Sequence, residues 1–176
     1  MNTALWKDYF SLLMEFEGTV YECDPNDPGG ATKYGVDQRS HPDVKIRNLT
    51  LGQAEQIYLA EYGASAAAKL PSPISFAYFD IRVNCGEGTA AKCLQRALGV
   101  RDDGIAGKQT IAAALAMISA GKSANLLLKL SAQRDLYYMN LAHVRPSDAR
   151  YLPGWLNRSK SMKNWAASRL DNGGAA

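Results

Sequence analysis

The chain has 176 residues, a mass of 19.1 kDa, 47% hydrophobic residues and a net charge of +3. This composition is sufficient for a buried core and excludes a disordered chain, and the length accommodates one compact domain or two small lobes. The longest apolar stretches fall short of the roughly 18 residues of a transmembrane helix. The N-terminus lacks the cationic start and apolar run of a secretory signal. We therefore expect synthesis in the cytosol without a signal peptide.

The charges are unevenly distributed along the chain. Residues 1–68 contain five basic and ten acidic residues, whereas residues 120–176 contain nine basic and three acidic residues. A basic end favours an anionic partner, such as nucleic acid, an anionic lipid surface or a cell wall rich in carboxylates and phosphates.

Hydrophobic residues at helical spacing predict a first amphipathic helix over residues 3–17. The predicted core stripe comprises Leu5, Tyr9, Leu12, Leu13 and Phe16. Gly18 supplies a C-terminal stop. Glu17 follows Leu13 by four residues, so we expect it beside the buried face at the last turn, partly shielded from water.

The next segment, residues 21–32, is rich in proline and glycine and predicts a loop or short hairpin. Beyond it, Thr50 is a candidate N-cap of a second helix. The apolar positions of that helix are Ala54, Ile57, Tyr58 and Tyr62. Further helices are predicted over residues 74–84, 90–98, 108–120, 123–144 and 154–170. The fold class is mainly α, with a small loop or β-hairpin element after the first helix.

Cysteine and histidine usage argues against a structural zinc site. Cys23, Cys85 and Cys93 are widely spaced, and the chain has only two histidines. Neither pattern matches a metal-ligand spacing or a nucleophilic triad. Free thiols in a reducing compartment are the simplest interpretation.

Glu17 is the candidate for acid catalysis. A glycosidase needs a carboxylic acid that stays protonated near neutral pH, and usually a second group that acts at the anomeric carbon or orients water there. A Glu at a helix end against apolar side chains meets the first requirement, because desolvation raises its pKa. The position alone is not specific, since most Glu side chains are solvated surface charges.

A longer motif is more informative. The run EGTVYECDPNDPGGATKYGV, from Glu17 to Val36, resembles the signature of glycoside hydrolase family 108, the muramidase family of many phage endolysins. The resemblance continues through residues 49–62 and 79–86. Similarity to the peptidoglycan-binding module that follows the catalytic part in such proteins covers residues 94–100, 103–111 and 154–158.

The resemblance implies a lysozyme-like helical fold, with a catalytic lobe over residues 1–88 and a helical peptidoglycan-binding module over residues 89–176 packed on it. It implies Glu17 as the general acid that cleaves the β-1,4 bond between N-acetylmuramic acid and N-acetylglucosamine, with no cofactor and no metal. Asp24 and Thr32 are further catalytic candidates. Asp24, like Asp27, can orient water or substrate, with bracing of the turn as the alternative. Thr32 can hold the attacking water or hydrogen-bond the Glu17 carboxyl, with a plain turn hydroxyl as the alternative.

Candidate substrate-binding residues are Asp27, Tyr58, Tyr62, Tyr78 and Asn84. The tyrosines are chosen because aromatic faces suit pyranose rings and the hydroxyls stay wet at a cleft rim, although core packing is the alternative. Asn84 can bind an N-acetyl group or cap the next segment. Three positions depart from the family pattern: Thr19 replaces a second Gly, Cys85 replaces Ser, and Gly63 replaces an aromatic that can stack on sugar.

Other functions stay open at this stage. A lytic transglycosylase uses the same single acid, but closes the muramic acid on itself to an anhydro product. A wall-binding protein of a phage particle or secretion device would use Glu17 only structurally. A nucleic-acid binder is disfavoured by the acidic first third and the lack of a reader motif.

The resemblance and the charge pattern also lead to expectations about partners and location. We expect a monomer that binds peptidoglycan glycan strands. The basic segment of residues 155–170 either docks on the core or inserts into an anionic outer membrane. An endolysin made in the host cytoplasm without a signal peptide needs a separate pore former to reach the periplasm and lyse the host wall.

Overall fold

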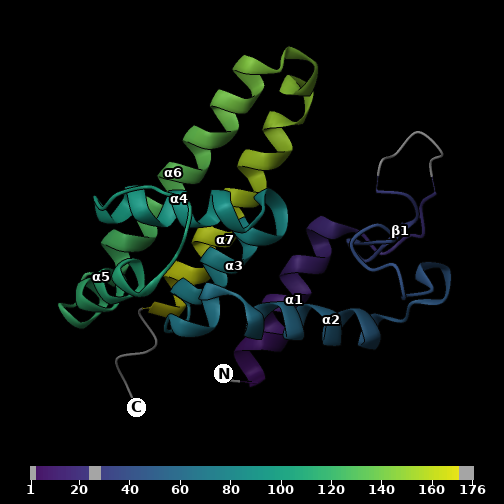
Figure 1. Cartoon of the computed structure of the whole chain (residues 1–176), viewed down its shortest axis with the longest axis horizontal. Helices are drawn as coiled ribbons and strands as arrows, with labels where there is room; N and C mark the ends of the chain where they lie inside the picture. Colours follow the sequence, from purple (N-terminus) through teal and green to yellow (C-terminus); the bar gives the residue numbers. More distant parts are fainter. Residues whose placement is uncertain (1–2, 24–28, 171–176) are drawn as a thin grey trace. The chain divides into compact units, whose positions relative to one another are not determined.

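The computed structural model describes residues 3–23 and 29–170. Over these residues the chain forms seven α-helices and one two-stranded antiparallel sheet, together with short 3-10 helices. The chain divides into two compact units, Met1–Gly63 and Ala64–Ala176 (Figure 1). Each unit has buried hydrophobic residues of its own.

The first unit is built from two helices and a small hairpin. Its elements are α1 (Thr3–Glu17), β1 (Thr32–Lys33), β2 (Val36–Asp37), the 3-10 helix η1 (Ile46–Asn48) and α2 (Leu51–Ala64), whose last residue already belongs to the second unit. An isolated bridge between Glu22 and Thr32 extends the hairpin toward the end of α1.

Aromatic rings hold α1 and α2 together. The ring of Trp6 lies 5.7 Å from that of Tyr62, and the Trp6 Nε1 donates to the Glu55 carboxylate at 2.9 Å. The ring of Phe10 lies 6.0 Å from that of Tyr58. Each aromatic pair contributes about 0.5–1.5 kcal/mol beyond the area it buries. These contacts fix the face that α1 presents to α2.

The buried face of α1 differs in part from the predicted stripe. It comprises Trp6, Tyr9, Phe10, Leu13 and Met14. Tyr9 and Leu13 were predicted, whereas Leu5, Leu12 and Phe16 are only half-buried. The face is rotated because the larger rings of Trp6 and Phe10 make the contacts with α2.

Two residues, Tyr34 and Gly35, form the turn of the hairpin, and Lys33 pairs with Val36 across it. Both turn residues have positive φ angles, 55° and 74°, as the tightest hairpin turns require. Gly35 adopts this conformation without steric cost, whereas a residue with a Cβ bears about 1–2 kcal/mol of strain there. Lys33 Nζ donates to the Leu49 carbonyl at 2.8 Å, which ties the hairpin to the segment before α2.

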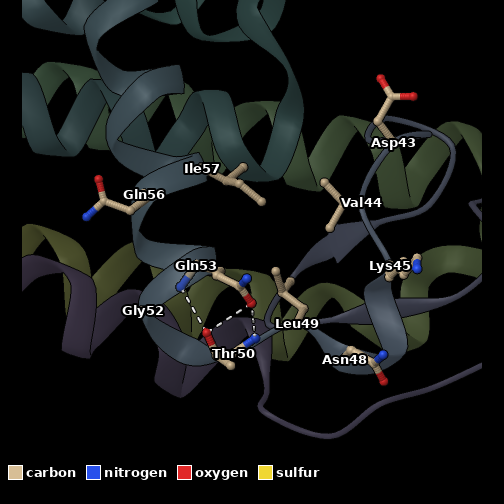
Figure 2. A pocket seen from close by; sticks show the side chains of 10 residues that line it. All are labelled: Asp43, Val44, Lys45, Asn48, Leu49, Thr50, Gly52, Gln53, Gln56 and Ile57. Atoms are coloured by element: carbon tan, nitrogen blue, oxygen red, sulfur yellow. Dashed lines mark hydrogen bonds between the residues drawn. The ribbon is translucent and has the colours of Figure 1, made fainter.

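A reciprocal pair of hydrogen bonds starts α2, as predicted from Thr50. The Thr50 hydroxyl accepts from the Gln53 backbone N–H at 3.3 Å, and the Gln53 Oε1 accepts from the Thr50 N–H at 2.9 Å (Figure 2). This capping box satisfies two N–H groups at the helix start. It fixes where α2 begins, and therefore which residues face α1.

The second unit is helical throughout. Its elements are η2 (Ala66–Lys69), α3 (Ile74–Cys85), α4 (Glu87–Leu98), α5 (Lys108–Ser119), α6 (Ser123–Val144), η3 (Pro146–Tyr151) and α7 (Leu152–Leu170). The long helix α6 packs against α3, α4, α5 and α7. In Figure 1, α6 and α7 run side by side and are joined at one end through η3.

A buried ionic cluster lies in the core of this unit. Asp80 on α3 is fully buried. Its carboxylate forms salt bridges with Arg134 Nη1 at 2.7 Å and with Arg158 Nη2 at 2.9 Å. Burial alone would raise the pKa of Asp80, but the two guanidinium groups hold it below its ordinary value of 3.8. The cluster joins α3, α6 and α7 through one carboxylate.

The predicted helices are confirmed, with shifts at two N-termini. Helix α4 begins at Glu87 rather than residue 90, because Gly86, with φ of 83°, ends α3 and starts α4 within one residue. Helix α7 begins at Leu152 rather than residue 154, since Pro153 is tolerated in a first turn. The mainly α class with a small hairpin after the first helix is confirmed.

The division into units and the sequence-based lobes are not the same. Residues 64–88, assigned from the sequence to the catalytic lobe, lie in the second compact unit. The lobe boundary after residue 88 stays a prediction. None of the helices formed by residues 3–23 and 29–170 is long and apolar enough to cross a membrane.

Candidate active site

Glu17 is the last residue of α1 and continues its buried face. It follows Leu13 by four residues and Phe10 by seven, and both are buried. The Glu17 side chain is half-buried, and its Oε1 is shielded from solvent. Gly18, with φ of 74°, ends the helix directly after it and turns the chain away. Glu17 therefore stands at the last turn of the helix beside its buried face, as predicted.

The hairpin turn lies directly against this carboxyl group. A Cβ atom placed on Gly35 would be only 2.7 Å from Glu17 Oε2 and 2.9 Å from Glu17 Cβ, and it would also meet the Tyr58 hydroxyl. No side chain fits in this space. Gly35 is therefore glycine for two reasons, its positive φ and this close approach.

Tyr58 connects α2 to the hairpin turn beside Glu17. Its ring is buried on α2, and its hydroxyl donates to the Tyr34 carbonyl at 3.0 Å. The helix end, the hairpin turn and α2 thus meet around Glu17 within the first unit. The arrangement leaves one carboxyl oxygen shielded while holding the turn at a fixed distance from it.

The other catalytic candidates are only partly placed. Thr32 lies in β1 of the same hairpin, half-buried, with its hydroxyl 3.5 Å from the Gly30 carbonyl. Its backbone pairs with that of Glu22. Asp24 and Asp27 lie outside the residues that the structure describes. The second catalytic group thus stays a prediction.

The three tyrosines predicted to stack on sugar are all buried. Tyr62 packs its ring edge against Trp6, with ring centroids 5.7 Å apart. Tyr78 lies in α3 of the second unit, and its hydroxyl donates to Glu87 Oε1 at 2.5 Å. Burial and this hydrogen bond raise the pKa of Tyr78. Packing within their own units accounts for the positions of these rings, including Tyr58.

Among the members of the predicted set that the structure describes, Asn84 is the exposed one. It lies in the last turn of α3 in the second unit. Its Oδ1 accepts a hydrogen bond from the Tyr138 hydroxyl at 2.5 Å. The side chain therefore does not cap α4, which begins after Gly86 without a side-chain cap.

A hollow of about 830 Å³ lies in the first unit between the segment before α2 and the first turns of α2 (Figure 2). Its volume is in the range of small-molecule sites. Its lining residues are Asp43, Val44, Lys45, Asn48, Leu49, Thr50, Gly52, Gln53, Gln56 and Ile57. Val44 and Ile57 face each other across it, and Asn48, Gln53 and Gln56 contribute amide side chains to its lining. Neither Glu17 nor any predicted substrate-binding residue lines it.

Sequence reasoning missed two site residues, Tyr34 and Gly35. The available signal was a glycine preceded by an aromatic residue and followed by an aliphatic one, directly after the proline-glycine loop. That pattern indicates a tight turn, but the approach of the turn to Glu17 depends on the tertiary fold. Among the described residues, no group of three Asp, Glu, His or Cys side chains is arranged to hold a metal ion.

Comparison with known proteins connects this geometry to a family. Residues 10–86 match the family Glycosyl hydrolase 108, and residues 89–160 match the Predicted Peptidoglycan domain. A solved structure described as "Structure of Brucella abortus SagA" is similar to this chain, with 24% sequence identity and a TM-score of 0.76. The similarity covers 95% of this chain and 96% of that one, and supports the fold. A comparison of this sequence with curated proteins found no match.

The resemblance seen in the sequence is thereby confirmed. The first match contains Glu17 and the hairpin, and the second contains α5 and α6 completely. Together the two matches support a glycoside hydrolase that acts on peptidoglycan.

Proposed function

We propose that this protein, whose residues 10–86 match glycosyl hydrolase 108, is a muramidase, which hydrolyses the β-1,4 bond between N-acetylmuramic acid and N-acetylglucosamine with Glu17 as general acid. The position of Glu17 is the observation that carries the proposal. Its carboxyl group ends α1 inside the matched region, has one oxygen shielded from solvent, and lies against the Gly35 turn.

The environment of Glu17 suits proton donation. Shielding a carboxyl group from water disfavours its charged form, which favours the protonated acid that proton donation requires. That proton is transferred to the glycosidic oxygen as the bond to the leaving sugar breaks. Thr32, on the strand beside the turn, and Asp24 or Asp27 are proposed to orient water or substrate.

Turbidity loss of purified Gram-negative sacculi tests the role of Glu17. Glu17→Gln keeps the size of the side chain but cannot donate a proton as an acid, so we expect at least about a hundredfold loss of rate. Glu15→Gln is the matched control, because Glu15 is exposed on the same helix two residues earlier. It should lyse sacculi like the wild type. Equal lysis by Glu17→Gln and wild type would contradict the assignment.

Mass analysis of the released muropeptides tests the reaction. A muramidase admits water and produces reducing ends. An anhydro product, lighter by one water, would reassign the protein to the lytic transglycosylases. Binding to sacculi without lysis by the wild type would make it a wall-binding protein, with Glu17 structural.

We further propose that the protein is a monomeric phage endolysin that lyses the host cell wall. In this proposal it is made in the host cytoplasm and reaches the periplasm through a separate pore former. Expression in a Gram-negative host with and without a pore-forming protein tests this route. Lysis without the pore former would contradict the proposed release route. A dimer on gel filtration would contradict the proposed monomer.

The basic C-terminal region is proposed to contact anionic wall components rather than to insert into the outer membrane. Helix α7 is docked in its unit, with Arg158 and Met162 buried and the Trp165 ring 5.6 Å from that of Phe76. Insertion would require these residues to leave their contacts. Leakage of anionic vesicles at low protein concentration would favour insertion instead.

A further inference from the structure

A chain of hydrogen bonds runs from the buried core of the second unit to one exposed side chain. It begins at Asp80, which pairs with Arg134 Nη1 at 2.7 Å. Arg134 Nε donates to the Tyr138 hydroxyl at 2.8 Å, one helical turn later on α6. The Tyr138 hydroxyl donates to Asn84 Oδ1 at 2.5 Å. Asp80, Arg134 and Tyr138 are at most 2% exposed, whereas Asn84 is exposed.

The donors in this chain determine which way the Asn84 amide points. A guanidinium group can only donate, so the Tyr138 oxygen accepts from Arg134 and its single hydrogen is left for Asn84. The atom of Asn84 that receives it must be the acceptor Oδ1, and Nδ2 therefore faces away from Tyr138. Among the residues that the structure describes, Asn84 Nδ2 has no hydrogen-bond partner. The result is an amide donor held in a fixed direction at the surface.

Ring contacts lead from Tyr138, the partner of this amide, to two further aromatic residues that reach the surface. The Trp155 ring stacks on the Tyr138 ring at 5.3 Å and 22°, and Trp155 is half-exposed. Tyr151, 48% exposed, lies 5.9 Å from Trp155. The guanidinium of Arg150 covers the Tyr151 ring at 4.7 Å and is exposed. Asn84, Tyr138, Tyr151 and Trp155, which we name the Asn84 patch, thus combine an oriented N–H, aromatic surface and a neighbouring positive charge.

Stability alone gives a poor account of this network. Buried ion pairs are weak evidence for stabilisation, because desolvation offsets the attraction between the charges. Arg134 also buries its Nη2 without a hydrogen-bond partner among the described residues, which adds a desolvation cost. The feature that the network does define at the surface is the direction of the Asn84 amide.

We propose that the Asn84 patch binds an N-acetylated, carboxylate-bearing glycan strand, with Asn84 Nδ2 donating to an acetamido carbonyl and a sugar ring lying against Trp155 and Tyr151. Tyr138 acts as a positioning residue for Asn84. The positive charge of Arg150 suits the carboxylates of a muramic acid strand. This inference rests on the proposed function, because it takes peptidoglycan as the ligand, and it adds a contact in the second unit.

The test measures binding to purified sacculi by pelleting, with every variant made in the Glu17→Gln background so that the wall stays intact. Asn84→Asp replaces the outward N–H by an oxygen acceptor, and we expect about tenfold weaker binding from the loss of one hydrogen bond to the glycan. Trp155→Ala should weaken binding to a similar extent. Asn125→Asp is the matched control, since Asn125 is an exposed asparagine in the first turn of α6, whereas Tyr138 lies toward the end of that helix. It should bind like the parent.

A second comparison separates positioning by Tyr138 from a merely structural role. Tyr138→Phe keeps the ring under Trp155 but removes the hydroxyl that orients Asn84, so binding should weaken severalfold. In the presence of Asn84→Ala the same change should have no further effect on binding, because no amide is left to orient. A loss of equal size in both backgrounds would overturn the positioning role.

The outcomes distinguish this inference from the proposed function. Unchanged sacculus binding by Asn84→Asp and Trp155→Ala would overturn the Asn84 patch, while lysis dependent on Glu17 would still support the muramidase. Binding of a DNA duplex in competition with sacculi, lost in the same variants, would overturn the glycan assignment. The N-acetylglucosamine tetramer serves as an uncharged sugar probe of the patch. A change in tryptophan fluorescence when it is added, which disappears in Trp155→Phe, would support the sugar contact with Trp155.

Discussion

Gly35 is the residue on which the geometry around Glu17 depends most directly. Gly35→Ala places a methyl group against Glu17 Oε2 and the Tyr58 hydroxyl, and imposes a positive φ on a residue with a Cβ. The turn must move away, and displacement of a catalytic group by about 1 Å can reduce the rate roughly hundredfold. We expect that reduction in sacculus lysis, with helical circular dichroism retained.

Gly63→Ala is the control for this change. Gly63 is the second-last residue of α2, has no positive φ, and a Cβ there meets open space. An alanine in a helix is favoured over glycine, by at most about 0.5–1 kcal/mol. The variant should therefore melt slightly higher and lyse normally. Full activity of Gly35→Ala would show that the approach of the turn is not needed.

Tyr34 stores strain next to the same site. Its φ of 55° belongs to a conformation that asparagine tolerates and that two-residue hairpin turns favour as Asn-Gly. Tyr34→Asn should relieve part of the strain, but it removes the contact of the Tyr34 ring with Lys33 Nζ, 5.1 Å from the ring centroid. We expect a net gain of about 0.5–1 kcal/mol in the free energy of unfolding. A urea titration measures it, and a lower midpoint would mean that the ring contacts outweigh the strain.

Individual residues show where sequence reasoning reached its limit. The place of Glu17 at the end of a helix was predictable, because it depends on local periodicity and a following glycine. The burial of Arg158 was not, since its sequence neighbours Ser159 and Lys160 are typical of a solvated helix face. Arg158 is buried only because Asp80, 78 positions away, supplies a carboxylate. Such long-range pairing leaves no periodic signal.

At the level of elements, the start of α2 rests on the capping box of Thr50 and Gln53. Thr50→Ala removes the oxygen that accepts from the Gln53 N–H, and we expect a loss of about 1 kcal/mol in the free energy of unfolding. Gln53→Ala should cost a similar amount. Because the two side chains act reciprocally, the double variant should lose less than the sum of the single losses. Additive losses in urea titrations would argue against a coupled box.

Element boundaries were predictable where a single residue determines them. Gly18 marks the end of α1 and Thr50 the start of α2 through chemistry that is local to each residue. The start of α4 was placed three residues late because Gly86 allows two helices to meet almost without a loop. The hairpin was expected only as a loop or hairpin, since four strand residues are too few to give an alternating pattern.

At the scale of the whole molecule, the fold class followed from composition and helical periodicity, but the division into units did not. Helix α3 was assigned to the catalytic lobe because it follows α2 in the chain and lies within the family resemblance. In the structure it packs against α4, α6 and α7, and Asp80 connects it to two of them. Contacts across 54 and 78 positions decided its unit, and they are not readable from local pattern.

Loss of the Asp80 carboxylate alone should therefore destabilise the second unit strongly. Asp80→Asn leaves two buried guanidinium groups without a counter-charge, and breaking a buried ion pair in this way costs roughly 3–5 kcal/mol. We expect a large fall in the thermal midpoint. Asp102→Asn is the control, because the Arg96–Asp102 pair is exposed and should contribute nothing measurable. Similar midpoints for both variants would contradict the importance of the cluster.

The same carboxylate predicts how stability depends on pH. Since Arg134 and Arg158 hold the folded-state pKa of Asp80 below 3.8, its contribution is fully present above that value and is lost as the pH falls through the lowered pKa. Asp37 and Asp103 also have lowered pKa values, so acid sensitivity of the wild type alone does not identify Asp80. The informative quantity is the difference in unfolding free energy between wild type and Asp80→Asn, in which the other groups cancel. That difference should be constant from neutral pH down to about pH 5 and shrink below about pH 4. A difference that stays constant to the acid limit would mean that the pKa of Asp80 is the same in the folded and unfolded states, or that the variant has rearranged its core.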